Sequence, residues 1–135
     1  YVTNRTHDLE EYTRNNIKNL GLPLDEDIDV LLMKNEKGWT SDKTSRRDLI
    51  SKDFRVIHIF GDQLDDFIPL KDTATSISSR KMLIDKYSDM WGQKWFMLIN
   101  PMYGEWEEAI YEHCWSCFPE ESDRVNQRLK ALDKN

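Results

Sequence analysis

Short apolar runs alternate with amphipathic stretches along this sequence, and that alternation constrains its fold more than any other feature. The clearest run is FRVIHIF at 54–60, which is rich in β-branched and aromatic residues and ends abruptly at Gly61. Further strand-like runs lie at 1–3, 28–33 and 93–99. Strands that alternate with helices predict an α/β fold, in which a parallel sheet carries helices on both faces.

Apolar residues at helical spacing lie between and after these runs. The stretch 65–78 has no clear period and predicts a loop. Since no linker, internal repeat or low-complexity tract interrupts the pattern, residues 1–135 are expected to form part of a single domain. Helices are predicted at 7–20, 43–52, 79–90, 106–117 and 119–132.

The net charge of −6 at pH 7 bears on the kind of partner that this chain can bind. Proteins bind polymeric nucleic acid largely through its phosphate backbone, so an acidic chain is a poor candidate for a nucleic-acid module. A small phosphate ligand stays open, because a local pocket can oppose the overall charge. The apolar runs also fall short of the ~20 residues that a membrane-spanning helix needs.

The two cysteines, Cys114 and Cys117, form a single CxxC motif that follows His113. A structural zinc site would need about two more ligands at suitable spacing, and the sequence has no second CxxC. A redox motif would place the cysteines at the start of a helix, whereas these come late in a helical pattern. We therefore expect both cysteines to be small apolar residues on a packed helix.

The strongest chemical signal is the segment GDQLDDF at 61–67, directly after the best strand. Ligands of open α/β sheets bind at the carboxyl ends of the strands, and here Asp62, Asp65 and Asp66 lie within five residues. Their mutual repulsion would be relieved by a hard divalent cation such as Mg²⁺. A polar loop that caps the next turn with an aspartate is an equally good interpretation of this spacing alone.

A second signal is the segment YVTNR at 1–5, where a strand is followed by Thr3, Asn4 and Arg5 just before a predicted helix. Hydroxyl, amide and guanidinium groups beside a helix N-terminus can hold a phosphate. The alternative is an ordinary helix cap with a solvated arginine.

A third signal is the segment KTSRR, which places Lys43, Arg46 and Arg47 ahead of an apolar helical face. Lysine is a compact charge suited to neutralising a phosphate oxygen. For Arg46 and Arg47 we expect a solvated basic face.

Together these segments resemble the class C non-specific acid phosphatases, the bacterial lipoprotein-type branch of the haloacid dehalogenase superfamily. The resemblance covers nearly the whole chain. It implies a Rossmann-like parallel sheet and the hydrolysis of small phosphomonoesters. The segments that carry it are YVTNR at 1–5, NLGLP at 19–23, KTSRR at 43–47, GDQLDDF at 61–67 and KWFMLINPMYGEWE at 94–107.

The resemblance implies roles for the residues that would hold the phosphate. Thr3 matches a residue whose hydroxyl binds the phosphoryl group, and Asn4 and Arg5 match the continuation of that motif. Lys43 matches the lysine that steadies the phosphate and the nucleophile. Thr3 and Lys43 are therefore the catalytic candidates on this chain.

The resemblance also implies Mg²⁺ as the cofactor, with its ligands in the GDQLDDF segment. Asp62 matches a metal ligand. Asp66 matches its partner, which acts either as a ligand through water or as a residue that orients the site. Asp65 lies between them and ranks third.

One departure from the family pattern is large, because the sequence contains no DxDxT motif. In the family this motif carries a nucleophilic aspartate, which forms an aspartyl-phosphate, and a general acid. Asp25, Asp27 and Asp29 alternate, but no threonine follows them in the required place, so the role is not transferred to them. We expect residues 1–135 to be the C-terminal part of the domain, inactive alone and without its first strand. The alternative is a catalytically silent relative, such as a storage or binding protein.

The segment NPMYGEW at 100–106 follows a strand and is therefore expected at the same sheet edge as Asp62. Tyr103 lies before the next helix and could stack on a nucleobase or an aryl group, whereas the helical spacing of Trp106 predicts a core residue. The resemblance points the same way, since it implies nucleoside monophosphates and aryl phosphates as substrates.

The resemblance further implies an exported protein, either periplasmic or an outer-membrane lipoprotein. Any lipid anchor would lie outside this chain. The sequence does not fix the oligomeric state, and a homodimer is one of the assemblies that it allows.

Overall fold

The computed structural model describes residues 1–73 and 76–132. The chain forms two compact units, Tyr1–Val56 and Ile57–Asn135, and each is described by itself. Both units combine helices with a pair of parallel strands, so the α/β prediction is confirmed. The expectation of a single domain stays a prediction. No helix among the described residues is long and apolar enough to cross a membrane.

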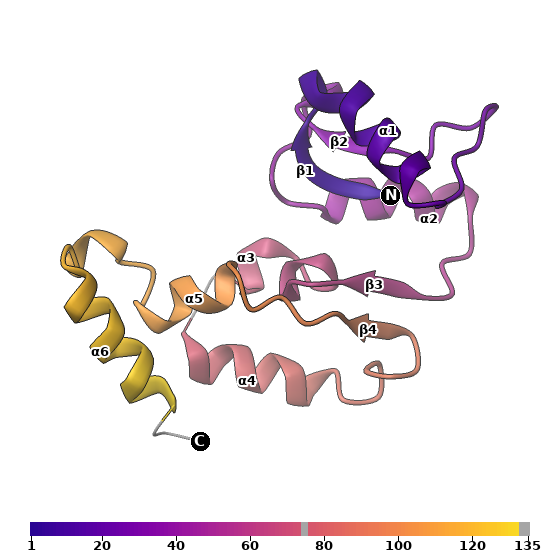
Figure 1. The fold of residues 1–135 in the computed structure, drawn as a ribbon. Helices are drawn as coiled ribbons and strands as arrows, with labels where there is room; N and C mark the ends of the chain where they lie inside the picture. Colours follow the sequence, from indigo (N-terminus) through magenta and orange to yellow (C-terminus); the bar gives the residue numbers. More distant parts are fainter. Residues whose placement is uncertain (74–75, 133–135) are drawn as a thin grey trace. The chain divides into compact units, whose positions relative to one another are not determined.

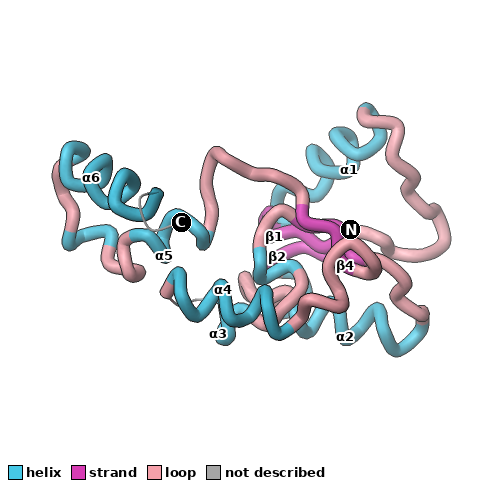
Figure 2. The backbone as a smooth tube through the Cα atoms, turned by 90° about the horizontal axis from the view of Figure 1, so that it is seen from below, coloured by secondary structure: helices cyan, strands magenta, loops and turns pink. Residues whose placement is uncertain are grey.

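The first unit is built on the parallel strands β1 (Val2–Thr6) and β2 (Leu32–Lys34). Helices α1 (Glu10–Asn19) and α2 (Thr44–Asp53) lie on opposite sides of this pair (Figures 1 and 2). Short 3₁₀ turns precede α1 at His7–Leu9 and follow β2 at Glu36–Gly38.

The core of the first unit follows from the pleat of β2. Leu31, which directly precedes β2, and Met33 point to one face, as alternate residues of an extended chain do, and pack against Ile17 of α1. Leu32 is also buried and belongs to the opposite face. An apolar run that is buried on both faces is the pattern expected of a parallel strand.

The strand β1 is longer than the sequence predicted, because it runs to Thr6 instead of ending at Thr3. Its register against β2 is irregular between these two residues, where Thr3 pairs with Met33 and Thr6 with Lys34. Asn4 and Arg5 lie in this irregular stretch, so these two candidate phosphate residues are outside the regular pairing of β1 with β2.

The second unit contains the parallel strands β3 (Ile59–Gly61) and β4 (Trp95–Met97). A 3₁₀ turn (Leu64–Asp66) and helix α3 (Leu70–Thr73) follow β3, and helix α4 (Ile77–Lys86) leads to β4. Helices α5 (Glu105–Ile110) and α6 (Glu121–Leu132) complete the unit, with a 3₁₀ turn at Trp115–Cys117 between them. The core groups the buried residues Leu64, Phe67 and Ile68 with the half-buried Ile59, Leu83, Tyr87, Trp91 and Trp95.

The expected strand 54–60 is much shorter in the structure, where only Ile59–Gly61 pair as a strand. Among the described residues, β3 pairs with β4 along one edge and with no strand along the other. Phe60 stacks on Phe96 with ring centroids 4.9 Å apart, yet 63% of Phe60 is exposed. A strand that lacks a neighbour cannot extend its ladder, which explains the short length of β3.

Two other predictions are wrong. The expected loop 65–78 contains α3, and α4 starts at Ile77 because the Ser76 hydroxyl accepts a hydrogen bond from the Ser79 N–H. Residues 74 and 75 of that loop lie outside the described residues.

The expected helix 106–117 ends at Ile110. Glu112 and His113 then adopt positive φ values of 51° and 58°, which reverse the chain. Cys114 and Cys117 form a disulfide in the turn that follows, so they are not apolar residues of a packed helix.

Candidate active site

Strand β1 contains the first group of candidate residues, Thr3, Asn4 and Arg5. The Thr3 hydroxyl accepts a hydrogen bond from the Arg5 N–H at 3.2 Å. The Arg5 guanidinium in turn donates to the Thr13 hydroxyl at 3.4 Å, a weak contact that points Arg5 along α1. Asn4 is exposed, and its side-chain oxygen accepts from Arg46 at 2.8 Å.

Arg46 contradicts the expectation of a solvated basic face, because its exposed fraction is 0%. Its guanidinium donates to the carbonyl oxygen of Thr3 at 2.6 Å and to that of Thr40 at 3.0 Å. Burial lowers the pKa of Arg46, while the nearby Asp42 opposes this shift. A charged side chain with no water contact needs several acceptors, and the backbone around β1 supplies them.

Lys43 lies directly before α2 and is half-buried. Its carbonyl oxygen accepts the Arg47 N–H at 3.0 Å, which closes the first turn of the helix. The Asp42 side chain accepts the Thr44 N–H at 2.8 Å and so caps the same turn. The β1 cluster, defined as Thr3, Asn4, Lys43 and Arg46, thus joins strand β1 to the start of α2.

The end of β3 carries the acidic residues of the second unit. Asp62 is exposed and follows β3 directly. Asn100, which follows β4, donates its side-chain amide to Asp62 Oδ2 at 2.6 Å. The Asn100 Oδ1 accepts the Met102 N–H at 3.1 Å, so the orientation of this amide is fixed at both ends.

Asp66 turns back toward the backbone of its own loop. Its Oδ2 accepts the N–H groups of Asp62 and Gln63, both at 2.9 Å. Gly61 is required for this approach, because a Cβ built there would lie 2.7 Å from the Asp66 Cγ. Asp66 therefore fixes the path of the chain around Asp62 and fits the orienting role better than that of a direct ligand.

These contacts define the β3 cluster, which consists of Asp62, Asp66 and Asn100. Mg²⁺ is commonly held by one or two protein carboxylates together with the phosphate of the substrate. Asp62 is accessible, and Asn100 occupies one of its two oxygens, so the other can bind a cation. The cluster fits a hard divalent ion with Asp62 as its protein ligand. Asp65 is buried, with an exposed fraction of 6%, and belongs to the interior.

The loop that contains Tyr103 is tied to the same strand end. The Gln63 side chain donates to the Tyr103 carbonyl at 3.1 Å and packs against Gly104, whose φ of 147° few other residues adopt. Tyr103 itself is 69% exposed. A hollow of about 290 Å³ lies beside Asp62, with Arg80, Ile84, Leu98, Asn100 and Trp106 in its wall.

Another group of titratable side chains lies outside the β3 cluster. Glu105, Glu108 and His113 hold ligand atoms within 4.8 Å of one another, the only such group of three among the described residues. Burial, and then repulsion from Glu108 and Asp65, raise the pKa of Glu105. Arg80 lies 4.0 Å from the Glu105 carboxylate and supplies the compensating charge.

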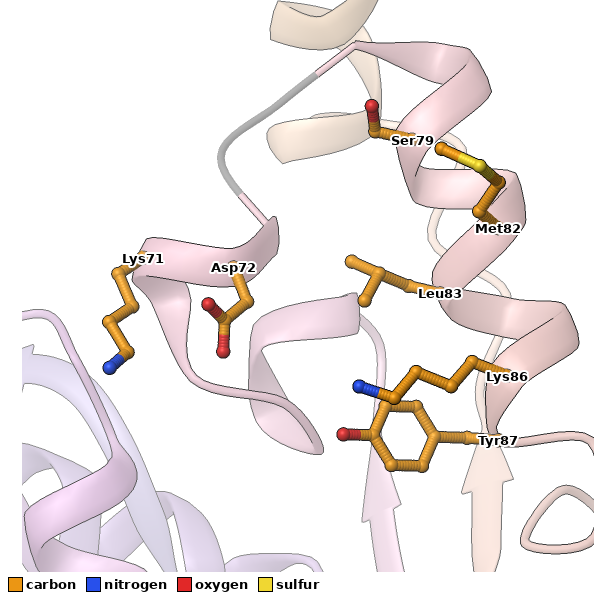
Figure 3. A pocket seen from close by; sticks show the side chains of 7 residues that line it. All are labelled: Lys71, Asp72, Ser79, Met82, Leu83, Lys86 and Tyr87. Carbon is orange, nitrogen blue, oxygen red and sulfur yellow. The ribbon is translucent and has the colours of Figure 1, made fainter.

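A wider hollow of about 530 Å³ lies between α3 and α4 (Figure 3). Leu83 of α4 and Tyr87, which directly follows that helix, extend into it, and Lys86 lies over the Tyr87 ring at 5.1 Å (Figure 3). No predicted site residue lines this hollow, so it is separate from both clusters.

Sequence reasoning missed two residues of these clusters. Asn100 carries no predicted role in the segment 100–106, although an amide that directly follows a strand at the same sheet edge as acidic residues is a signal that could have identified it. Arg46 gave no such signal, because its main partners lie 43 and 42 residues away in the chain.

A family model and two solved structures that are similar to this chain all describe acid phosphatases. A family model for subfamily IIIB of the HAD superfamily, described as acid phosphatase, matches residues 1–106. A solved structure of the class C acid phosphatase from Bacillus anthracis is similar, with 26% identity and a TM-score of 0.78. A second structure of that enzyme, with tungstate bound, gives a TM-score of 0.79.

Both structures match 96% of this chain, whereas the chain spans only 52% of theirs, about half their length. No protein in the curated set matches.

Proposed function

Because this chain belongs to subfamily IIIB of the haloacid dehalogenase superfamily, the acid phosphatases, we propose that the protein hydrolyses small phosphomonoesters with a divalent cation, Mg²⁺. The observation that carries this proposal is the β3 cluster. An exposed carboxylate at a strand end, oriented by Asn100 and by the Asp66-bound loop, is suited to a hard cation. The family generally uses a divalent metal.

The proposed roles divide between the two clusters. Thr3, Asn4 and Lys43 hold the phosphoryl oxygens through hydroxyl, amide and ammonium donors, with Arg5 completing the motif. Asp62 holds the cation, and Asp66 keeps the loop in position. The bound cation would offset negative charge that develops on the phosphoryl group. The tungstate in the related enzyme is an oxyanion, which supports an oxyanion site in this family.

The proposed nucleophile is an aspartate outside residues 1–135, since this sequence contains no DxDxT motif. It would attack phosphorus and form an aspartyl-phosphate. A second aspartate of that motif would donate a proton to the leaving alcohol and then accept one from water.

The proposed substrates are nucleoside monophosphates and aryl phosphates. Tyr103 is exposed, and its loop is fixed to the Asp62 loop through Gln63. An aromatic ring in that place can stack on a base or aryl leaving group.

We also propose an exported location, either periplasmic or on the outer membrane through a lipid anchor outside this chain, and a homodimeric assembly. The disulfide between Cys114 and Cys117 supports export, because disulfides persist in oxidising compartments.

The test is turnover by the intact protein in which Lys43 is changed to alanine. We expect Lys43→Ala to lower the rate of phosphate release by more than about ten-fold, because it removes a charge that acts on the transferring group. Lys52→Ala, at an exposed position on α2, the helix that Lys43 directly precedes, is the matched control.

Equal rates for both variants would refute the assignment of Lys43. A wild-type protein that binds phosphate but shows no turnover at any divalent-cation concentration would identify a silent relative instead.

A further inference from the structure

Arg46 is completely buried although it carries a charge, and its partners reveal what it holds together. One edge of the guanidinium donates to the β1 segment, at the Thr3 carbonyl (2.6 Å) and the Asn4 side chain (2.8 Å). It also donates to the segment before α2, at the carbonyl oxygens of Thr40 (3.0 Å) and Asp42 (3.5 Å). A planar fork with several fixed donors can join two segments in this way, whereas a lysine ammonium cannot match the geometry.

The two joined segments carry the residues that the proposed function assigns to the phosphate. One contains Thr3 and Asn4, and the other ends at Asp42, immediately before Lys43. The distance between the Asn4 amide and the Lys43 ammonium therefore depends on the length and orientation of the Arg46 side chain.

Arg46 also sets the orientation of the Asn4 amide. Arginine has only donors, so the Asn4 atom that faces it must be the oxygen, as the 2.8 Å contact records. The Asn4 nitrogen, which is the donor, then lies on the edge of the amide that faces away from the guanidinium. Since Asn4 is exposed, this edge can meet an oxyanion.

We propose that Arg46 is a positioning residue for oxyanion binding, which orients the Asn4 amide and fixes its distance from Lys43 without touching the oxyanion itself. This inference rests on the proposed function. The exposed fraction of Arg46 is 0%, so Arg46 cannot contact a ligand that binds from solvent. This burial distinguishes Arg46 from basic residues that bind phosphate directly.

A purely structural role makes a different prediction. A residue that only stabilises the fold lowers the melting temperature, but leaves the affinity of the folded protein for its ligand unchanged. Ile17→Ala, in the core between α1 and β2, is the matched control of that kind, because it removes buried apolar contacts with Leu31 and Met33 and deletes no hydrogen-bond acceptor of the Arg46 guanidinium.

The experiment measures the dissociation constant for inorganic phosphate, in the presence of Mg²⁺, by calorimetry on the intact protein. It is done at a temperature where circular dichroism shows each variant to be folded. We expect Arg46→Lys to weaken phosphate binding on the order of ten-fold, because a displaced donor loses most of its contribution. Ile17→Ala should lower the melting temperature and leave the dissociation constant unchanged.

Asn4→Ala keeps the proposal testable even where Arg46→Lys does not fold, since Asn4 is exposed. It should weaken phosphate binding by itself. If Arg46→Lys folds, the double variant of Asn4→Ala and Arg46→Lys should lose less phosphate affinity than the product of the two single fold-losses. The reason is that both changes act through the same Asn4 amide. An unchanged affinity in Asn4→Ala, or fully independent effects, would overturn the positioning role.

Lys43→Ala separates this inference from the proposed function. If it leaves phosphate affinity unchanged, the phosphate site itself is wrong. If it weakens binding while Arg46→Lys behaves like Ile17→Ala, only the positioning role of Arg46 is refuted.

Discussion

Replacing Asp66 with alanine tests the account of how the strand-end loop is built. The Asp66 carboxylate accepts two backbone N–H groups, from Asp62 and Gln63, each at 2.9 Å. The variant deletes the one oxygen, Oδ2, that accepts both bonds, and it leaves the two N–H donors to find water. Because one of these bonds is exposed and the other part-buried, their contributions to stability differ.

The expected magnitude follows from the nature of the two bonds. A hydrogen bond to a charged group contributes about 1.5–3 kcal/mol when it is shielded and less when it is exposed. We therefore expect Asp66→Ala to lower the free energy of unfolding by about 2–3 kcal/mol. Asp66→Asn keeps an acceptor oxygen without the charge and should cost about half as much.

The assay is urea denaturation of the intact protein, with Asp89→Ala as the control at an exposed aspartate. The midpoint should fall for Asp66→Ala while the slope stays constant, since the unfolded state exposes the same surface. A change in free energy no larger than that of Asp89→Ala would refute the structural role of this carboxylate.

Two further predictions concern the same unit. Tyr103→Ala should raise KM for a nucleoside monophosphate several-fold and hardly change KM for a small alkyl phosphate; an equal loss on both would show that Tyr103 only supports its loop. Burial, and then repulsion from Glu108, raise the pKa of Glu105 in the folded protein above its ordinary value of 4.5. Protonated Glu105 therefore stabilises the fold fully below pH 4.5, and this stabilisation is lost as the pH rises through the higher pKa of the folded state. The melting temperature should therefore fall over this pH range in the wild type and fall less in Glu105→Gln. The same dependence of melting temperature on pH in both proteins would contradict the prediction.

Much of the architecture could be predicted because strand ends leave strong signals. The run 54–60 followed by Gly61 placed Asp62 at a strand end, and the structure puts it there. Helix α2 begins within one residue of its predicted start, since KTSRR precedes an apolar stripe in the sequence. Each of these signals is local and depends only on neighbouring residues.

The features that sequence reasoning missed depend on distant or geometric partners. Arg46 has the charge of a surface residue, and its burial becomes favourable only through acceptors on other segments, namely the Thr3 carbonyl, the Asn4 side chain and the Thr40 carbonyl. The pairing of Cys114 with Cys117 required the chain reversal at Glu112 and His113, which periodicity alone does not indicate.

The central claim is that Asp62 holds the divalent cation of a phosphomonoesterase. The most direct measurement is the Mg²⁺ dependence of phosphate release by the intact protein, compared between the wild type, Asp62→Asn and the exposed control Asp72→Asn. We predict that Asp62→Asn loses most Mg²⁺-dependent turnover and keeps its fold, because it deletes a charged ligand of a hard cation. Near-normal turnover and Mg²⁺ affinity in Asp62→Asn would contradict the claim.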